Sequence, residues 1–319
     1  MEENCRIKFR NSFDAFGISY EENADLKTKT WIHRGGRVGF YVCPNTVDEL
    51  KATLDICSDQ GIAPIVVGHT SNIYFSNDFN PKVVITTCKL TRWEVKDDII
   101  ECEPGVNVKK LSSFCVESGF DGFYGLVDLP GTIAGAAVNN SSCFGCSISR
   151  VLAGCDFYEN GVIHFLNEEL EYSFRSSALK EKKLDGTILR VYLKVVKEDK
   201  NILSARAVAV RESRRRTQEA AAKNLGSTYA EIKYNSLSKV VLKVANIISR
   251  LFNVREKKMS KKLLLFVYGY QRLDNYISDF NLGCFVWRDG NADMRFEEYR
   301  RFIAKISISS ILEIEHIRE

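Results

Sequence analysis

The sequence predicts an α+β protein of about two domains, and three observations support this. The first is the length of 319 residues, since a domain typically contains about 150 residues. The second is the alternation of short β-rich runs with helical patterns and Gly-rich turns. The third is a change to a basic, helical composition near residue 200. We therefore expect a first domain over residues 1–200 and a smaller α+β domain over residues 201–319.

The composition excludes several classes of protein. Hydrophobic residues make up 45% of the chain and charged residues 27%, which is ordinary for a globular protein with a sizeable core. The net charge of +4 is too small to indicate a nucleic-acid partner, whereas an anionic small substrate is compatible with it. No signal-peptide pattern and no apolar run of about 18 residues occurs. We expect a cytoplasmic protein without a transmembrane segment, whose ten cysteines stay reduced.

Local patterns predict the elements of the first domain in order. Pro44 ends a β-rich run, and a capping pattern at Asn45 and Thr46 then opens an amphipathic helix. The acidic pair Asp97 and Asp98 is typical of a turn inside a β-hairpin. The expected elements are strand 39–43, helix 45–59, strand 64–67, strand 83–87, hairpin 93–102, helix 108–118, and strands 154–158, 162–166 and 187–196.

The second domain is expected to open with a helix over residues 204–223. Four arginines between residues 211 and 216 are typical of a solvated helix face, although they could also attract nucleotide phosphates. Apolar spacing over residues 239–252 indicates an ordinary core helix; the lysines in 237–262 leave contact with an anionic membrane or a partner as the alternative. A Lys-rich turn is expected at 257–262, a strand at 263–268, a helix at 296–306 and a strand at 311–317.

Two glycine-rich segments are candidate ligand sites. Gly68-His69-Thr70-Ser71-Asn72 follows a buried strand, and its backbone N–H groups could point at one anion, as in a phosphate-binding nest. A tight turn closed by its own Ser and Asn side chains explains the same pattern. Residues 130–140 are typical of a turn that opens into a helix of small residues. The N-terminal amides of this helix suit a pyrophosphate, and close helix packing is the alternative.

His33-Arg34-Gly35-Gly36, the 68–72 loop and residues 125–145 follow one another in the order of a known enzyme family. They are similar to an Arg-x-Gly-Gly opening, a Gly-Gly-Gly-Ser-Asn flavin loop, and an Ile-Pro-Gly-Thr-x-Gly-Gly-Ala stretch followed by Asn and Tyr-Gly. From about residue 30 to its end, the chain resembles the UDP-N-acetylenolpyruvoylglucosamine reductase family.

The resemblance implies a fold and a cofactor. The fold is an FAD-binding domain of the vanillyl-alcohol-oxidase type with two subdomains, which holds FAD without a covalent bond and uses NADPH as cosubstrate. A loop histidine tethers flavin in some relatives of this fold, so a covalent link at His69 is the alternative. No metal site is expected, because Cys143 and Cys146 lack a second pair at zinc spacing. The implied cofactor-binding residues are Arg34, Gly35, Gly68, His69, Thr70, Ser71, Asn72, Pro130, Gly131, Thr132, Gly135, Ala136 and Asn140.

Three residues occupy catalytic positions by the same resemblance. Arg175 lies in a segment similar to the family's Tyr-Arg-x-Ser-x-x-Lys, Ser227 in its Gly-Ser, and Glu315 in its Leu-x-x-Glu. Arg175 and Glu315 would stabilise negative charge on an enolate, and Ser227 would protonate the adjacent carbon. Each residue taken singly is also explained by a surface ion pair, a capping hydroxyl or a solvated carboxylate.

The implied activity is reduction of the enolpyruvyl group of a UDP-sugar for peptidoglycan synthesis, with hydride passing from NADPH through FAD. Two motifs on the substrate side depart from the family. Residues 230–233 replace its Lys-Asn-Pro, and its Lys-His pair is missing from residues 278–285. The alternatives are an oxidoreductase of the same fold that acts on another nucleotide sugar or an alcohol, and a non-catalytic binding or scaffolding protein.

Overall fold

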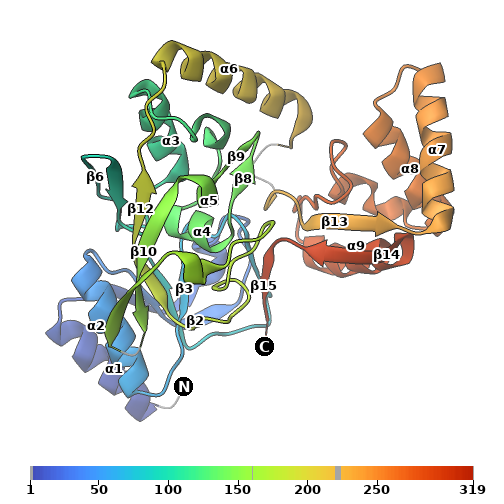
Figure 1. The fold of residues 1–319 in the computed structure, drawn as a ribbon. Helices are drawn as coiled ribbons and strands as arrows, with labels where there is room; N and C mark the ends of the chain where they lie inside the picture. The colour runs from blue at the N-terminus through green and yellow to red at the C-terminus, as the bar shows by residue number, and fades with distance from the viewer. Residues whose placement is uncertain (1–2, 160, 220–223, 319) are drawn as a thin grey trace. The chain divides into compact units, whose positions relative to one another are not determined.

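The computed structural model describes residues 3–159, 161–219 and 224–318, and the chain divides into two compact units (Figure 1). Two short segments from the first half of the chain belong to the second unit. Unit 1 comprises Met1–Thr30, Gly35–Thr70 and Asn77–Ser213; unit 2 comprises Trp31–Arg34, Ser71–Ser76 and Arg214–Glu319. The assignment of FAD to residues 1–200 and of substrate to residues 201–319 stays a prediction.

Unit 1 contains two main sheets. The first has the order β1-β2-β5-β3, with an antiparallel β1-β2 pair and parallel pairing of β2 and β3 to β5. The second has the order β11-β10-β12-β7-β6 and is antiparallel throughout. The strands are β1 (Tyr20–Asp25), β2 (Arg37–Val42), β3 (Ile65–Val67), β5 (Val83–Thr86), β6 (Trp93–Lys96), β7 (Ile99–Cys102), β10 (Leu152–Glu159), β11 (Val162–Leu166), β12 (Thr187–Lys194) and the small hairpin β8 (Ser142–Cys143) and β9 (Cys146–Ser147).

Each sheet of unit 1 has its own core. Phe9 and Phe13 pack on Phe40 of the first sheet, and Phe123 and Phe157 are buried with the second sheet. Unit 1 therefore has the two-subdomain α+β organisation that we predicted. Its helices are α1 (Glu3–Ala15), α2 (Val47–Asp59), α3 (Val108–Glu117), α4 (Ile133–Val138), α5 (Ile148–Val151), the part of α6 (Lys200–Thr217) up to Ser213, and the short 3₁₀ turns η1 (Leu26–Thr28), η2 (Tyr124–Leu126) and η3 (Glu168–Leu170).

Unit 2 is built around an aromatic core. Phe285 packs on Phe296 and Tyr299, with ring centroids 5.2 Å apart in both pairs. β13 and β14 form an antiparallel pair, while β15 pairs in parallel with β4. The elements are β4 (Ile73–Phe75), β13 (Tyr229–Tyr234), α7 (Ser236–Leu251), α8 (Glu256–Tyr268), η5 (Gln271–Tyr276), α9 (Ala292–Ile306), β14 (Ser307–Leu312) and β15 (Glu315–Ile317). Among the described residues, no helix has the length and apolar character needed to cross a bilayer.

Several element predictions need correction. The expected Lys-rich turn at 257–262 and strand at 263–268 are wrong, because both belong to helix α8. Lys261, Leu264 and Leu265 are all buried, and a lysine among the buried positions hides the helical period from the sequence. The strand expected at 311–317 is divided between β14 and β15. The helix expected over residues 204–223 begins and ends earlier, as α6, and residues 220–223 lie outside the described residues.

Candidate active site

Two of the predicted cofactor segments meet inside unit 1. Gly68 directly follows β3, and a Cβ atom at this position would lie 2.2 Å from Oγ1 and 2.8 Å from Cγ2 of Thr132. The imidazole of His69 forms a hydrogen bond with the backbone of Gly131. The loop after β3 thus lies directly against the start of α4. Only glycine permits this approach at position 68, because any side chain would overlap Thr132.

The backbone amides of these two segments differ in what they bind. The first three N–H groups of α4 are taken by protein acceptors, and the binding of a pyrophosphate by the turn that opens this helix stays a prediction. The acceptors of the three N–H groups are the carbonyl oxygens of Val106 (2.8 Å) and Pro104 (3.2 Å) and the hydroxyl of Thr132 (3.4 Å). For the N–H groups of Gly68 and His69, the described part of the chain provides no acceptor. These two amides are therefore donors that a phosphate could use here.

Burial of the His69 ring favours its neutral form. Burial lowers the pKa of its imidazole, and the hydrogen bond to the Gly131 backbone opposes this only in part. Thr70 follows in a left-handed backbone conformation, with φ of +53°, and is buried. Ser71 and Asn72 are assigned to unit 2, and the roles of Thr70, Ser71 and Asn72 in cofactor binding stay predictions.

The turn that carries Arg175 is tied to the end of α4 by two side chains. Asn140 donates from Nδ2 to the carbonyl of Ser173 at 2.8 Å, and the Ser177 hydroxyl donates to the carbonyl of Val138 at 2.6 Å. The Oδ1 atom of Asn140 also accepts from a backbone N–H, at 3.3 Å. Because both polar ends of Asn140 bind protein, we interpret it as a support for the Arg175 turn.

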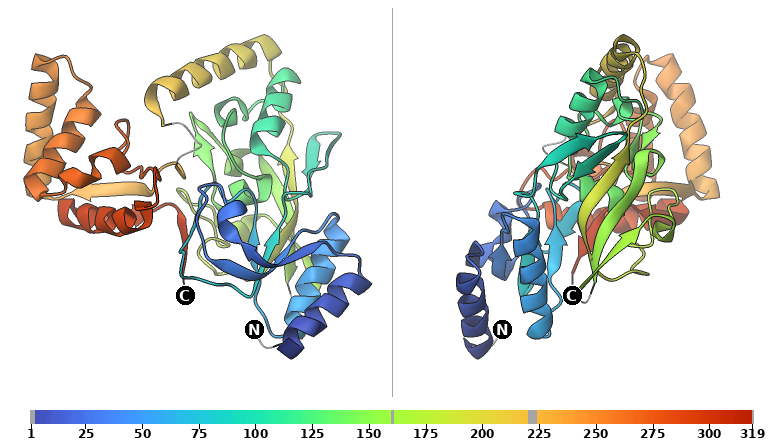
Figure 2. Two further views of the ribbon diagram at one scale, coloured as in Figure 1. Left: turned by 180° about the vertical axis from the view of Figure 1, so that it is seen from behind. Right: turned by 60° about the vertical axis from the view of Figure 1, so that its left-hand side comes forward.

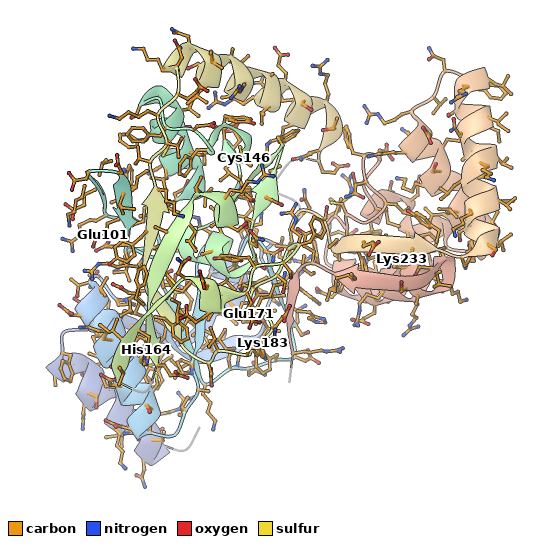
Figure 3. All side chains as sticks on the ribbon, in the orientation of Figure 1. Glu101, Cys146, His164, Glu171, Lys183 and Lys233 are labelled. Atoms are coloured by element: carbon orange, nitrogen blue, oxygen red, sulfur yellow. The ribbon has the colours of Figure 1, made fainter. Side chains whose placement is uncertain are left out.

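Arg175 itself has an unusual backbone conformation. Its φ is +58°, and the guanidinium carbon lies 6.0 Å from the centroid of the Phe174 ring. Its carbonyl accepts from Nζ of Lys180 at 3.0 Å. Glu171 and Lys183, which flank this turn in the sequence, form an ion pair with Nζ 2.7 Å from the carboxylate (Figure 3). The structure therefore places Arg175 in unit 1, on a turn anchored to the same small helix that Thr132 opens.

In unit 2, Asn281 orients the Ser227 side chain. Nδ2 of Asn281 donates to Oγ of Ser227 at 3.0 Å, and Oδ1 of Asn281 accepts from the N–H of Gly283 at 2.9 Å. Because Oγ of Ser227 accepts this bond, its own proton is left for another acceptor. This is the arrangement that a proton-donating hydroxyl needs. Our sequence reasoning missed Asn281, although it stands in the segment where the family's Lys-His pair is missing.

Backbone hydrogen bonds place Glu315 beside the Ser227 segment. The N–H of Glu313 donates to the carbonyl of Thr228, next to Ser227, at 2.8 Å. The N–H of Glu315 donates to the carbonyl of Asn72 at 2.9 Å, and Nδ2 of Asn72 donates to the carbonyl of Glu313 at 3.3 Å. Two predicted catalytic residues, Ser227 and Glu315, thus lie on neighbouring segments of unit 2. Asn72 binds the backbone of the segment that carries Glu315 at two points.

The Arg34-Gly35 pair is divided between the units. Nε of Arg34 lies 3.4 Å from Oδ2 of Asp293, and Nη2 donates to the carbonyl of Asp289. The guanidinium of Arg34 therefore binds two residues of unit 2. The N–H of Gly35 donates to Oδ1 of Asn77 in unit 1, at 3.0 Å. The contribution of both residues to cofactor binding stays a prediction, as do those of Pro130 and of Ala136, which is buried in α4.

The C-x2-C pair lies on the β8-β9 hairpin. Cys143 and Cys146 face each other in the strand register, and neither forms a disulfide. Cys146 is labelled in Figure 3. Its Sγ accepts from the N–H of Gly125 at 3.2 Å, which gives this thiol a structural role. Over the described residues, no three His, Cys, Asp or Glu side chains gather in a way that could hold a metal ion.

A family model described as an FAD binding domain matches residues 38–159, a stretch that contains the Gly68 loop and α4. The two-subdomain fold and this match define the class of the protein as an FAD-dependent oxidoreductase. The chain is 31% identical over 200 residues to a UDP-N-acetylenolpyruvoylglucosamine reductase of Thermosipho melanesiensis, covering 62% of this chain and 67% of that protein. It belongs to the UDP-N-acetylenolpyruvoylglucosamine reductase family.

Two further matches extend this result. A UDP-N-acetylenolpyruvoylglucosamine reductase of Caldicellulosiruptor saccharolyticus is 27% identical over 180 residues, which cover 56% of this chain and 58% of that protein. The crystal structure of a UDP-N-acetylenolpyruvylglucosamine reductase from Thermus caldophilus aligns with a TM-score of 0.66 and 19% identity, covering 94% of this chain and 99% of that one. The fold is thus shared well beyond the region of sequence identity, and our fold prediction is confirmed.

Proposed function

We propose that this chain reduces the enolpyruvyl group of a UDP-sugar, with NADPH as the electron donor and FAD as the bound cofactor. The product would be UDP-N-acetylmuramate or a close analogue, for peptidoglycan synthesis. Family membership supports the substrate class. The observation that carries the proposal is the hydrogen bond from Asn281 to Oγ of Ser227, because it leaves the Ser227 proton for a substrate carbon.

The residues around Gly68 fit a cofactor with phosphate groups. The missing Cβ of Gly68 lets the loop lie on Thr132, and two backbone N–H groups have no acceptor in the described structure. Gly68, His69 and Thr132 would therefore hold FAD without a covalent bond. When bound, FAD would supply the transfer of two electrons from NADPH to the substrate as a hydride.

The protein's own residues would handle the proton and the charge. Reduction of the double bond adds a hydride to one carbon and a proton to its neighbour, and it oxidises one NADPH. Ser227 would give that proton from Oγ, and solvent would restore it. From their family positions, Arg175 would stabilise the negative charge that develops on the substrate carboxylate before protonation, and Glu315 would do so as the acid, by donating a hydrogen bond from its protonated carboxyl group. Asn281 would act as a positioning residue, which keeps the Ser227 hydroxyl in one rotamer.

Anaerobic measurement of the two half-reactions tests this function. NADPH should bleach the flavin absorbance of the purified protein, and UDP-N-acetylenolpyruvoylglucosamine should restore it. Ser227→Ala should slow the restoration by about 10²–10⁴-fold, the usual contribution of a positioned general acid, and should leave the bleaching unchanged. Ser227→Cys should recover part of the rate, and Ser310→Ala, at an exposed position on β14, serves as the matched control.

Two outcomes would contradict the proposal in different ways. Equal restoration rates in the wild type and Ser227→Ala would remove Ser227 as the proton donor. A flavin that NADPH bleaches but that only a different nucleotide sugar or an alcohol-derived acceptor restores would overturn the substrate assignment and leave the oxidoreductase class intact.

A further inference from the structure

Helix α7 turns an apolar stripe away from its own unit. The stripe consists of Leu237, Val240, Val244, Ile247 and Leu251, whose exposed fractions are 54, 57, 42, 60 and 74%. Their spacing of three and four residues aligns them along one face of the helix. In Figure 1 and in the left view of Figure 2, α7 forms one edge of unit 2, with α8 beside it.

The buried face of α7 explains this orientation. Ser238, Ala245 and Ser249 are buried, and the hydroxyl of Ser238 lies 2.8 Å from that of Tyr268 on α8. Val241 is buried on the same face and packs in the core of unit 2, with Leu242 against it. This face of α7 is therefore covered, and the stripe on another side of the helix is left in water. Our expectation of an ordinary core helix is therefore wrong for the stripe, whose apolar pattern marks the exposed face.

Basic residues border the stripe. Lys239, Lys243 and Arg250 are the charged residues of α7, and none of its residues is acidic. At about 100° of rotation per residue, they lie about 100° around the helix axis from the centre of the stripe. Long basic side chains in this position can reach toward anionic groups while the apolar stripe enters a less polar layer.

The positive charge of the chain is concentrated around this helix. Residues 235–262 contain eight of the 45 Lys and Arg residues but one of the 41 acidic residues, so the other 291 residues carry 37 basic and 40 acidic side chains. Lys258 and Lys261 form ion pairs with Asp279, and the Arg255 guanidinium lies over the Phe280 ring. Three of the remaining five basic side chains of this segment, Lys239, Lys243 and Arg250, belong to α7 itself. A second copy of the chain would bring like charges together at this surface, whereas an anionic surface would be attracted.

We propose that α7 docks unit 2 on the surface of an anionic lipid bilayer. The stripe would enter the boundary between headgroups and acyl chains, and the bordering lysines and arginine would bind lipid phosphates. With 16 residues and three charges, α7 would lie in the plane of the membrane surface and not cross it. The proposal is independent of the reductase chemistry, which concerns other residues.

Sedimentation of the full, FAD-loaded chain with vesicles tests the docking. One set of vesicles contains phosphatidylcholine alone, and a second contains two parts of phosphatidylcholine to one part of phosphatidylglycerol. The chain should sediment with the second set only, and salt should release it because added ions screen the headgroup charge. Absence of binding to both sets, or equal binding to both, would overturn the proposal.

Matched variants separate the stripe from a general surface effect. Val240→Asp should weaken binding by roughly tenfold or more, since a carboxylate would enter the headgroup layer. Val208→Asp, on α6, should have no effect, although its valine is 52% exposed, against 57% for Val240. Equal loss in the two variants would contradict docking through α7. The proposal would also fail if light scattering showed a dimer for the wild type and a monomer for Val240→Asp while both sedimented equally with the anionic vesicles, because the stripe would then be a contact between two copies of the chain.

A second pair of variants keeps the apolar stripe intact. Lys239→Gln with Lys243→Gln should weaken binding by about fivefold for each charge removed. Lys8→Gln with Lys194→Gln has the same net charge, and this pair should bind like the wild type. In Leu251→Trp, a blue shift of tryptophan emission is expected with the anionic vesicles alone, because this side chain would leave water. No shift would mean that the stripe does not insert.

Discussion

Unit 1 and unit 2 form their candidate sites in different ways. In unit 1 the backbone does most of the work: Gly68 lies against Thr132, and N–H groups of the loop provide the donors. In unit 2 side chains form the site. Asn281 orients Ser227, and Lys261 binds Asp274, Ile277 and Asp279 in the segment that leads to Asn281. A backbone site tolerates few sequence changes, since each glycine is needed for space. A side-chain site can exchange its residues, which agrees with the departures from the family motifs in unit 2.

The largest expected effect is at the buried lysine of unit 2. Nζ of Lys261 donates to the carbonyls of Asp274 (2.7 Å) and Ile277 (3.1 Å) and pairs with Asp279 at 2.6 Å. Lys261→Met should lower the free energy of unfolding by roughly 3 kcal/mol, because these acceptors lose their partner. Urea unfolding measures the loss. Lys262→Met, next in sequence and exposed, should be nearly neutral, and equal losses would refute the special role of Lys261.

The matching test in unit 1 is Gly68→Ala. A Cβ atom 2.2 Å from Oγ1 of Thr132 would force the loop outward, at a cost of about 1–3 kcal/mol for overpacking. FAD affinity, measured by titration of the apoprotein, should fall by about 10–100-fold. Adding Thr132→Ala should restore part of it. Gly290→Ala, where a Cβ has open space, should leave the affinity unchanged; a wild-type affinity in Gly68→Ala would mean that the loop does not contact the cofactor.

A smaller effect is expected from Asn281→Asp. The carboxylate can still accept from the N–H of Gly283, but it cannot donate to Ser227, so the Ser227 proton would turn toward it. The half-reaction with the UDP-sugar should slow roughly tenfold, the effect of about 1.4 kcal/mol. Lowering the pH should recover the rate, since the introduced carboxyl group donates again once it is protonated; a purely structural defect would not respond this way. Asn275→Asp, at an exposed position, is the control.

The smallest effect concerns pH and His69. Burial lowers the pKa of its ring below the ordinary value of 6.5. At a pH between the two pKa values, the His69 ring therefore binds a proton in the unfolded chain but not in the folded chain. Stability should therefore fall as the pH drops below about 6.5 and should level off below the pKa of the folded state. Thermal unfolding from pH 8 to pH 5 measures this. His69→Gln should flatten the dependence, whereas His164→Gln, exposed on β11, should not; identical profiles would contradict the burial effect.

The sequence by itself determined the elements whose signals are local. Thr46 caps α2 by accepting from the N–H of Glu49, and the turn at Asp97 joins β6 to β7. These features depend on contacts within four residues, so their patterns can be read along the chain. The order of the motifs around Gly68, Thr132 and Arg175 likewise indicated the family, because a backbone site requires particular residue types at particular positions.

Only the tertiary structure decided which faces and groups are used. The apolar period of α7 predicted a helix, but packing decided that Val241 faces the core of unit 2 while the stripe faces water. Lys261 is buried because carbonyls and carboxylates ten or more residues away surround it, and Asn281 meets Ser227 across 54 positions of sequence. The sequence pattern of α4 indicates amides available to a ligand, whereas in the folded chain the carbonyls of Pro104 and Val106 accept from two of them. Contacts between distant segments leave no periodic trace in the sequence, so only the folded chain reveals them.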